Sequence, residues 1–279
     1  MLNKLLKHEF RATGRIMLPL LGVELLLSVL AGLSVRGLDR IGDMNFLGVT
    51  YVTTLIVFFL GLFAVGVVAV VLMIQRFYRN LLRDEGYLSM TLPVSVDAHI
   101  WAKLIVSFVW FLAVAVLTIL AMAVMVAIGS QLRFLSGFPE WSEVREFLRM
   151  AIGEFGGANL ALIPLEALLI SFFGTCAMCL RCYSALAIGG SAADHKLAYA
   201  FLAYIVIGIV PSLIQNGIGI GLANTDFGMD FFMREFSSAQ DSIRFFHTVM
   251  WLSILSSAIY SAIFYFVTRF FLKNKLNLA

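Results

Sequence analysis

Long apolar runs alternate along this chain with short charged segments. Each of six runs reaches the roughly 20 residues that an α-helix needs to cross a hydrocarbon core of about 30 Å. The pattern predicts an all-α integral membrane protein in which residues 1–279 form a single transmembrane domain. The six predicted spans are 16–35, 46–74, 104–132, 155–180, 197–225 and 245–268. Three of these runs exceed the core thickness, so we expect them to tilt, bend or project into water.

Composition supports the same class. Hydrophobic residues make up 61% of the chain and charged residues only 13%, and the mean hydropathy is +0.95. Of the 20 Lys and Arg residues, 13 fall on the side of the predicted spans that carries the termini and 7 on the other side. The positive-inside rule therefore predicts a multi-pass protein of the cell membrane with both termini in the cytoplasm. The net charge of +3 reflects this sidedness and does not indicate nucleic-acid binding.

Three segments outside the spans are predicted to be amphipathic. Residues 1–15 carry an apolar and a basic stripe, which predicts an interfacial elbow helix in the headgroup plane before the first span. The stripes consist of Leu2, Leu5, Leu6 and Phe10, and of Lys4, Lys7, Arg11 and Arg15. Residues 139–155 predict an amphipathic helix on the outer surface, and the segment 226–244 predicts a second cap there.

Two carboxylates occupy predicted spans, Glu24 in the first and Glu166 in the fourth. Ionisable groups at this depth are costly and usually face a bundle interior or a wet cavity. No Lys or Arg lies deep in any span, so we expect each carboxyl to be protonated, hydrogen-bonded to another helix or exposed to a transport path. Packing and pathway roles both remain open for them.

The fifth span contains Pro211, followed by Gln215, Asn216 and the glycines Gly217, Gly219 and Gly221. Proline removes a backbone hydrogen bond and glycine weakens a helix, so a continuous helix is not expected here. Irregular backbone at membrane depth must be buried in protein or line a cavity. The alternatives are a simple kink and a functional break.

Motifs for catalysis are missing from the sequence. No G-x-x-x-x-G-K-[ST] string is present, so the chain has no P-loop for ATP phosphates. The three cysteines Cys176, Cys179 and Cys182 are too few for a metal or iron–sulfur site and are expected to pack in a reduced compartment. We therefore expect no enzymatic activity, and no cofactor or metal, in this chain.

The charged segment 76–103 separates the second and third spans. Helically spaced leucines predict a short helix from Arg79 to Leu88 that lies across the membrane face. After Pro93, Ser95 can cap a new helix that has Asp97 in its first turn. A solvated loop that merely joins two spans is the alternative interpretation.

This segment resembles the first cytoplasmic loop of type-2 ATP-binding-cassette (ABC) exporter permeases. The resemblance rests on Asp84-Glu85-Gly86-Tyr87-Leu88, on Thr91-Leu92-Pro93-Val94-Ser95 and on Lys103. It implies a cytoplasmic coupling helix that docks on a separate ATPase subunit, which binds ATP and magnesium. The implied contact residues are Arg79, Arg83, Asp84, Glu85, Gly86, Tyr87 and Leu88. It also implies a second permease copy, identical or related, to complete the pathway.

Two other classes of function fit the same sequence. A secondary transporter or channel would use Glu24 and Glu166 as ion-coupling groups. A membrane anchor or sensor module would use the segment 76–103 to recruit a partner that is not an ATPase. The substrate of a transporter stays open, because peptides, toxins, drugs and lipids all suit an apolar interface.

Overall fold

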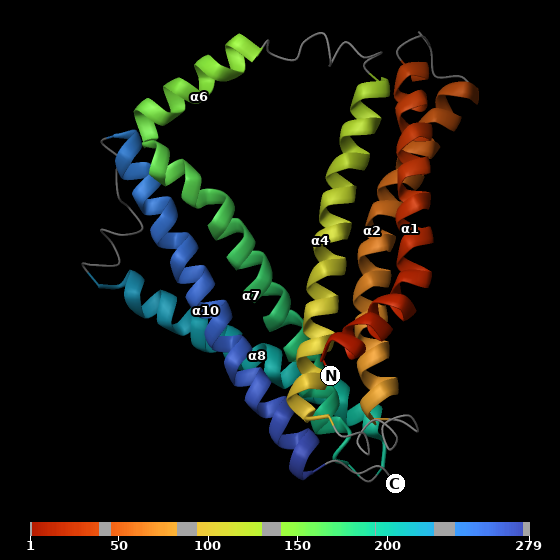
Figure 1. The fold of residues 1–279 in the computed structure, drawn as a ribbon, viewed down its shortest axis with the longest axis vertical. Helices are drawn as coiled ribbons and strands as arrows, with labels where there is room; N and C mark the ends of the chain where they lie inside the picture. The colour runs from red at the N-terminus through yellow and green to blue at the C-terminus, as the bar shows by residue number, and fades with distance from the viewer. Residues whose placement is uncertain are drawn as a thin grey trace. The chain divides into compact units, whose positions relative to one another are not determined.

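A computed structural model describes residues 2–38, 46–82, 94–129, 141–192, 194–225 and 238–275. Within these ranges the chain is all-helical and forms no strand (Figure 1). The helices are α1 (Leu2–Leu38), α2 (Phe46–Leu82), α4 (Val96–Gly129), α6 (Trp141–Phe155), α7 (Gly157–Gly189), α8 (Lys196–Ala223) and α10 (Ala239–Asn274).

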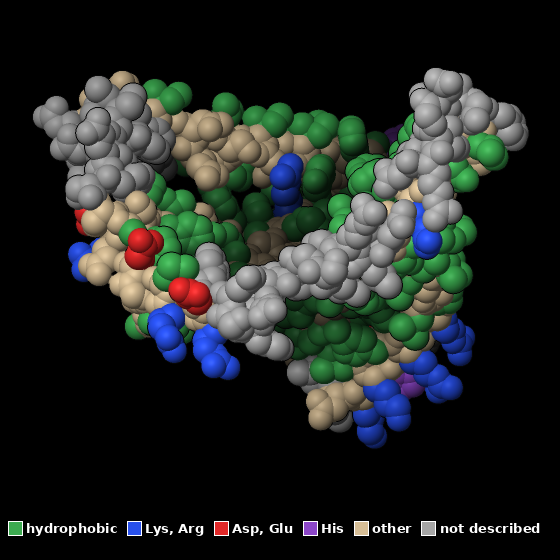
Figure 2. Space-filling model, turned by 90° about the horizontal axis from the view of Figure 1, so that it is seen from above, with side chains coloured by type: hydrophobic (Ala, Val, Ile, Leu, Met, Phe, Trp, Pro, Cys, Tyr) green, Lys and Arg blue, Asp and Glu red, His purple; other side chains and the backbone are tan. Residues whose placement is uncertain are grey.

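Six of these helices, all except α6, are long and apolar enough to cross a membrane. Large hydrophobic side chains are exposed on them, including Phe63 at 72%, Ile119 at 71% and Phe201 at 68%. Figure 2 shows hydrophobic side chains over much of the visible surface. Apolar exposure on this scale suits lipid rather than water. The prediction of an all-α membrane protein with six spanning helices is confirmed.

The chain divides into two compact units. The first comprises Met1–Arg76 and Ala98–Val144, and the second comprises Phe77–Asp97 and Arg145–Ala279. Helices α2 and α4 therefore contribute to both units.

In the first unit, α1, α2 and α4 surround an apolar core. Its buried side chains are Met17, Leu21, Val65, Ala69, Leu72, Met73, Val106, Trp110 and Val114. The indole Nε1 of Trp110 donates a hydrogen bond of 2.8 Å to Thr13 Oγ1, which joins α4 to α1. Farther along the same pair, a Cβ on Gly32 would lie 2.7 Å from Ile128 Cβ, so a larger residue would separate the helices.

In the second unit, α7 packs against both α8 and α10. Glu166 contacts His247 and, farther along both helices, the hydroxyl of Ser261 donates to the Phe173 carbonyl at 3.2 Å. Because these contacts occur in the same sequence order on the two helices, α7 and α10 run parallel (Figure 1).

Several helices extend beyond their predicted limits. Helix α2 continues to Leu82, where the sequence predicted an end at residue 74, and α4 begins at Val96 rather than at 104. Ser95 directly precedes α4 and Asp97 lies in its first turn, as predicted. At about 1.5 Å per residue, the 37-residue α2 is about 55 Å long, so its charged end can extend past the hydrocarbon.

The three predicted amphipathic segments, 139–155, 1–15 and 226–244, have different outcomes. Helix α6 begins at Trp141, which confirms a helix within 139–155. The segment 1–15 is not a separate element, because α1 is continuous from Leu2 to Leu38, although the helix changes direction near its N-terminal end in Figure 1. The interfacial position of the elbow stays a prediction. The predicted cap at 226–244 lies largely outside the described residues, and its last part belongs to α10.

Helix α8 is continuous through Pro211, so the predicted interruption of the fifth span is wrong, whereas the alternative of a kink stays a prediction. The missing N–H of Pro211 removes the helical hydrogen bond to the Ile207 carbonyl, a loss that membrane helices tolerate where they pack against other helices. Two other carbonyls of this stretch accept hydrogen bonds from side chains. The Ser212 hydroxyl donates to the Gly208 carbonyl at 2.8 Å. The Tyr260 hydroxyl, from α10, donates to the Pro211 carbonyl at 3.4 Å.

Candidate functional site

The predicted partner-contact segment begins at the end of α2. Arg79 lies in the last turns of this helix and is exposed, so Arg79 through Leu82 belong to α2 rather than to a separate helix. The other predicted contact residues, Arg83, Asp84, Glu85, Gly86, Tyr87 and Leu88, lie outside the described residues. The coupling helix therefore stays a prediction.

The two ends of this segment are fixed within the second unit. On α2, the ring of Phe77 stacks on that of Tyr183 from α7, with centroids 3.9 Å apart and planes at 7°. At the start of α4, Asp97 Oδ1 accepts hydrogen bonds from Tyr265 Oη at 2.5 Å and from Arg269 Nε at 2.9 Å, both on α10. A displacement of the segment would thus act on α7 through Phe77 at one end and on α10 through Asp97 at the other end.

A buried ion network joins three helices of the first unit. Glu9 on α1 accepts hydrogen bonds from Arg76 Nε on α2 at 2.9 Å and from Lys103 Nζ on α4 at 2.8 Å. The side chain of Lys103 is only 5% exposed and that of Glu9 10%. Sequence reasoning missed this network, because its members are 67 and 94 positions apart and each one alone resembles an interfacial charge.

Glu24 lies in the interior of the first unit and is 1% exposed. The Thr118 hydroxyl on α4 donates to Glu24 Oε1 at 2.8 Å, so the carboxyl is hydrogen-bonded to a neighbouring helix as one prediction had it. Glu24 Oε2 is buried without a hydrogen-bond partner among the described residues.

Glu166 on α7 is fully buried and pairs with His247 on α10, with 2.7 Å between Oε2 and Nδ1. His247 lies in the third turn of α10, which begins at Ala239. The expectation that Glu166 lacked an ionisable partner considered only Lys and Arg and overlooked this histidine. Glu166 Oε1 and His247 Nε2 are both buried and have no partner in the described part of the chain.

The remaining predicted pathway residues lie on α8. Gln215 and Asn216 are exposed, whereas Pro211 is half-buried beside α10. Glu24 belongs to the first unit and Glu166 to the second, so the two carboxylates are in different packing environments.

The cysteines of α7 are buried, and none of them forms a disulfide among the described residues. Across the ranges that the structure describes, no three His, Cys, Asp or Glu side chains gather closely enough to hold a metal ion.

Comparison with models of known protein families, with curated proteins and with solved structures gives no match. The residues and their geometry are therefore the basis for any assignment of function.

Proposed function

We propose that this chain is the membrane-spanning permease subunit of an ABC transporter, an exporter that is driven by a separate ATPase subunit. The proposal rests on one observation: the Asp84-to-Ser95 string, which resembles a coupling loop, joins two long apolar helices whose adjoining ends are held by α7 and α10. A docked ATPase would move this string, and the anchored ends would carry the movement into the membrane helices.

Two further features support this mechanism. The Phe77–Tyr183 stack is almost completely buried, since both rings are at most 1% exposed, so it resists displacement of α2 from α7. The Asp97–Arg269 pair is partly exposed, and exposed ion pairs are worth under about 1 kcal/mol. It therefore orients the start of α4 relative to α10 more than it stabilises the contact. In this mechanism the mechanical load passes chiefly through Phe77.

The permease carries no chemistry of its own in this proposal. One six-helix subunit offers half of a substrate pathway, so a second copy, identical or related, completes it. ATP and magnesium bind to the ATPase partner. Both termini face the cytoplasm in this proposal, because their side of the membrane carries 13 of the 20 basic residues. The coupling segment is on the same side and therefore faces the ATPase partner.

The test reverses the charge of Asp84 and Glu85 together. The D84K/E85K variant should insert normally, since these residues lie outside the predicted spans, but should lose co-purifying ATPase or substrate-stimulated ATP hydrolysis. The matched control is E146K/E154K, which reverses two exposed carboxylates of α6. If D84K/E85K retains both the ATPase and its stimulation at the level of the control, the coupling assignment fails.

A secondary transporter or channel is the second candidate, and the Glu166–His247 pair favours it. A buried carboxyl and imidazole lie 2.7 Å apart, and each has one polar atom without a partner among the described residues, so the pair offers a polar site for a coupling ion or a substrate within the helices. In proteoliposomes without an ATPase, wild type would then move substrate in response to a proton gradient and Glu166→Gln would not. Absence of gradient-driven transport in wild type would reject this candidate.

A further inference from the structure

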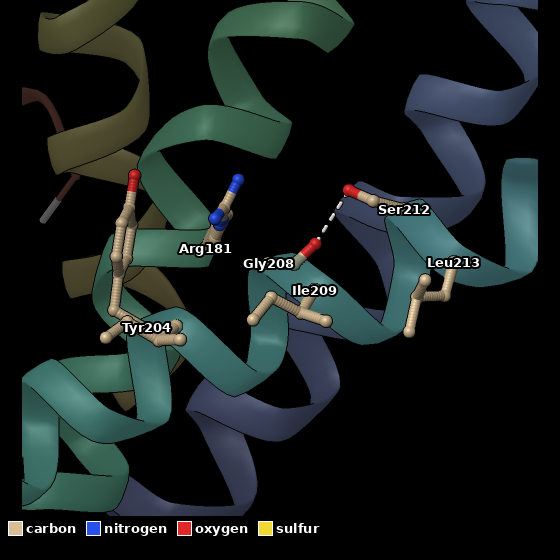
Figure 3. Close-up of a pocket in the computed structure, with 7 residues that line it drawn as sticks. Arg181, Tyr204, Gly208, Ile209, Ser212 and Leu213 are labelled. Carbon is tan, nitrogen blue, oxygen red and sulfur yellow. Dashed lines mark hydrogen bonds between the residues drawn. The ribbon is translucent and has the colours of Figure 1, made fainter.

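Arg181, on α7, lies between α7 and α8 in the second unit. Its guanidinium carbon is 4.4 Å from the centroid of the Tyr204 ring on α8. Figure 3 shows Arg181 on α7 beside Tyr204 and Gly208 of α8. Helix α7 is long and apolar enough to span a membrane, and an Arg near the end of such a helix can reach the headgroup region.

The donors of this guanidinium are not satisfied by the protein around it. The ion pairs of the described residues do not include Arg181, and its Nε is buried without a hydrogen-bond partner there. The contact with Tyr204 uses the flat face of the guanidinium, whereas its five N–H groups point outward in the plane. The hydrogen-bonding edge of the guanidinium is therefore available to a ligand.

Gly208 leaves room for the guanidinium of Arg181 beside α8. A Cβ on Gly208 would lie only 1.7 Å from one Nη of Arg181, so no other residue fits unless the guanidinium moves. Glycine otherwise weakens the interior of a helix, which makes this position a specific accommodation of Arg181.

The groove beside Arg181 has a volume of about 420 Å³ and is mostly apolar. Ile205, Ile209 and Leu213 recur every fourth residue and so follow one face of α8. Their exposure rises away from the cation, from 37% through 52% to 66%. A ligand that fits this groove combines an anionic head with an apolar chain.

The depth of Arg181 indicates which amphiphile this is. The fourth predicted span is 155–180, so Arg181 directly follows its last residue. If α7 crosses the membrane over that span, the guanidinium lies at the edge of the hydrocarbon, next to the headgroup region in which phospholipids carry their phosphate.

We propose that Arg181, Tyr204 and the α8 face of Ile205, Ile209 and Leu213 form a binding site for an anionic phospholipid. The phosphate accepts hydrogen bonds from the guanidinium, and one acyl chain lies along the apolar face of α8. A net negative headgroup is preferred, because a zwitterionic headgroup brings a second cation next to Arg181. The site requires only that the chain spans a membrane, so it does not depend on the transport proposal.

The test measures lipid binding to the full chain in mild detergent by native mass spectrometry. Wild type should bind phosphatidylglycerol about tenfold more tightly than phosphatidylcholine, because both phosphates accept the same hydrogen bonds but only choline places a second cation near Arg181. Arg181→Gln should abolish this preference. Gly208→Ala should do the same with the charge retained, since its Cβ displaces the guanidinium. Arg244→Gln, which removes an exposed cation of α10, is the matched control and should bind as wild type does.

Several results would overturn the proposal. One is equal binding of the two lipids by wild type. Another is an undiminished preference for phosphatidylglycerol in both Gly208→Ala and Arg181→Gln. If Arg181→Gln fails to fold, the result for Gly208→Ala alone decides. Complete displacement of the lipid by excess inorganic phosphate would identify a site for free anions instead. A shift from dimer to monomer in Arg181→Gln, with lipid binding unchanged, would identify the groove as a seam between two copies.

Discussion

The Glu9 network offers the sharpest test of how the first unit is held together. Glu9→Gln keeps the size of the side chain but removes the charge that faces Lys103 Nζ at 2.8 Å and Arg76 Nε at 2.9 Å. Removing one partner of a buried ion pair costs about 3–5 kcal/mol. The lower end applies, because Arg76 is 26% exposed and can be hydrated, so the penalty comes mainly from Lys103. We expect Glu9→Gln to lower the free energy of unfolding by about 3 kcal/mol.

A double-mutant cycle separates this penalty from lost packing. Lys103→Met alone should cost a similar amount, whereas Glu9→Gln with Lys103→Met should be no less stable than either single variant, which gives a coupling energy of at least about 3 kcal/mol. The assay is reversible unfolding in mixed micelles, followed by circular dichroism. Arg11→Gln, at an exposed position of the same helix, is the control and should change stability by less than about 0.5 kcal/mol. Additive effects of the two single variants would refute the network as a source of stability.

Three other predictions follow from single contacts. His247→Leu leaves the buried Glu166 without its partner and should destabilise the chain by about 1–3 kcal/mol, measured by the same unfolding assay, while a loss below 0.5 kcal/mol would contradict the pairing. Phe77→Ala removes a fully buried ring and should cost about 3–5 kcal/mol, and a negligible change in melting temperature would show that the stack does not hold α2. For the orientation, an impermeant thiol reagent on sealed cells should label Glu146→Cys and not Asn274→Cys, both at exposed positions, and the reverse pattern would invert the topology.

Much of the fold could be predicted from the sequence because membrane helices depend on length and hydrophobicity alone. The six apolar runs correspond to the six long helices, and the amphipathic pattern of 139–155 corresponds to α6. Helix ends were predicted less well. Hydropathy falls where charged residues begin, yet Arg76 and Lys103 are both helical, because Glu9 satisfies their charges.

The pairings in the candidate sites could not be predicted from the sequence. Glu166 and His247 are 81 positions apart, and nothing local to either residue indicates the other. The expected break at Pro211 had a similar cause, since propensity takes account of the lost hydrogen bond but not of the packing of α8 against α7. Both errors came from treating a residue in isolation where a tertiary contact decides its state.

The parallel contacts of α7 and α10 restrict how these two helices can move. Sliding one past the other by a helical turn is a shift of about 5.4 Å, which would break the Glu166–His247 contact and the weaker contact of Ser261 with the Phe173 carbonyl. The Ser261 hydroxyl also bonds the Ser257 carbonyl of its own helix at 2.7 Å, so the resistance to sliding comes mainly from Glu166 and His247. We therefore expect α7 and α10 to tilt together more readily than they slide.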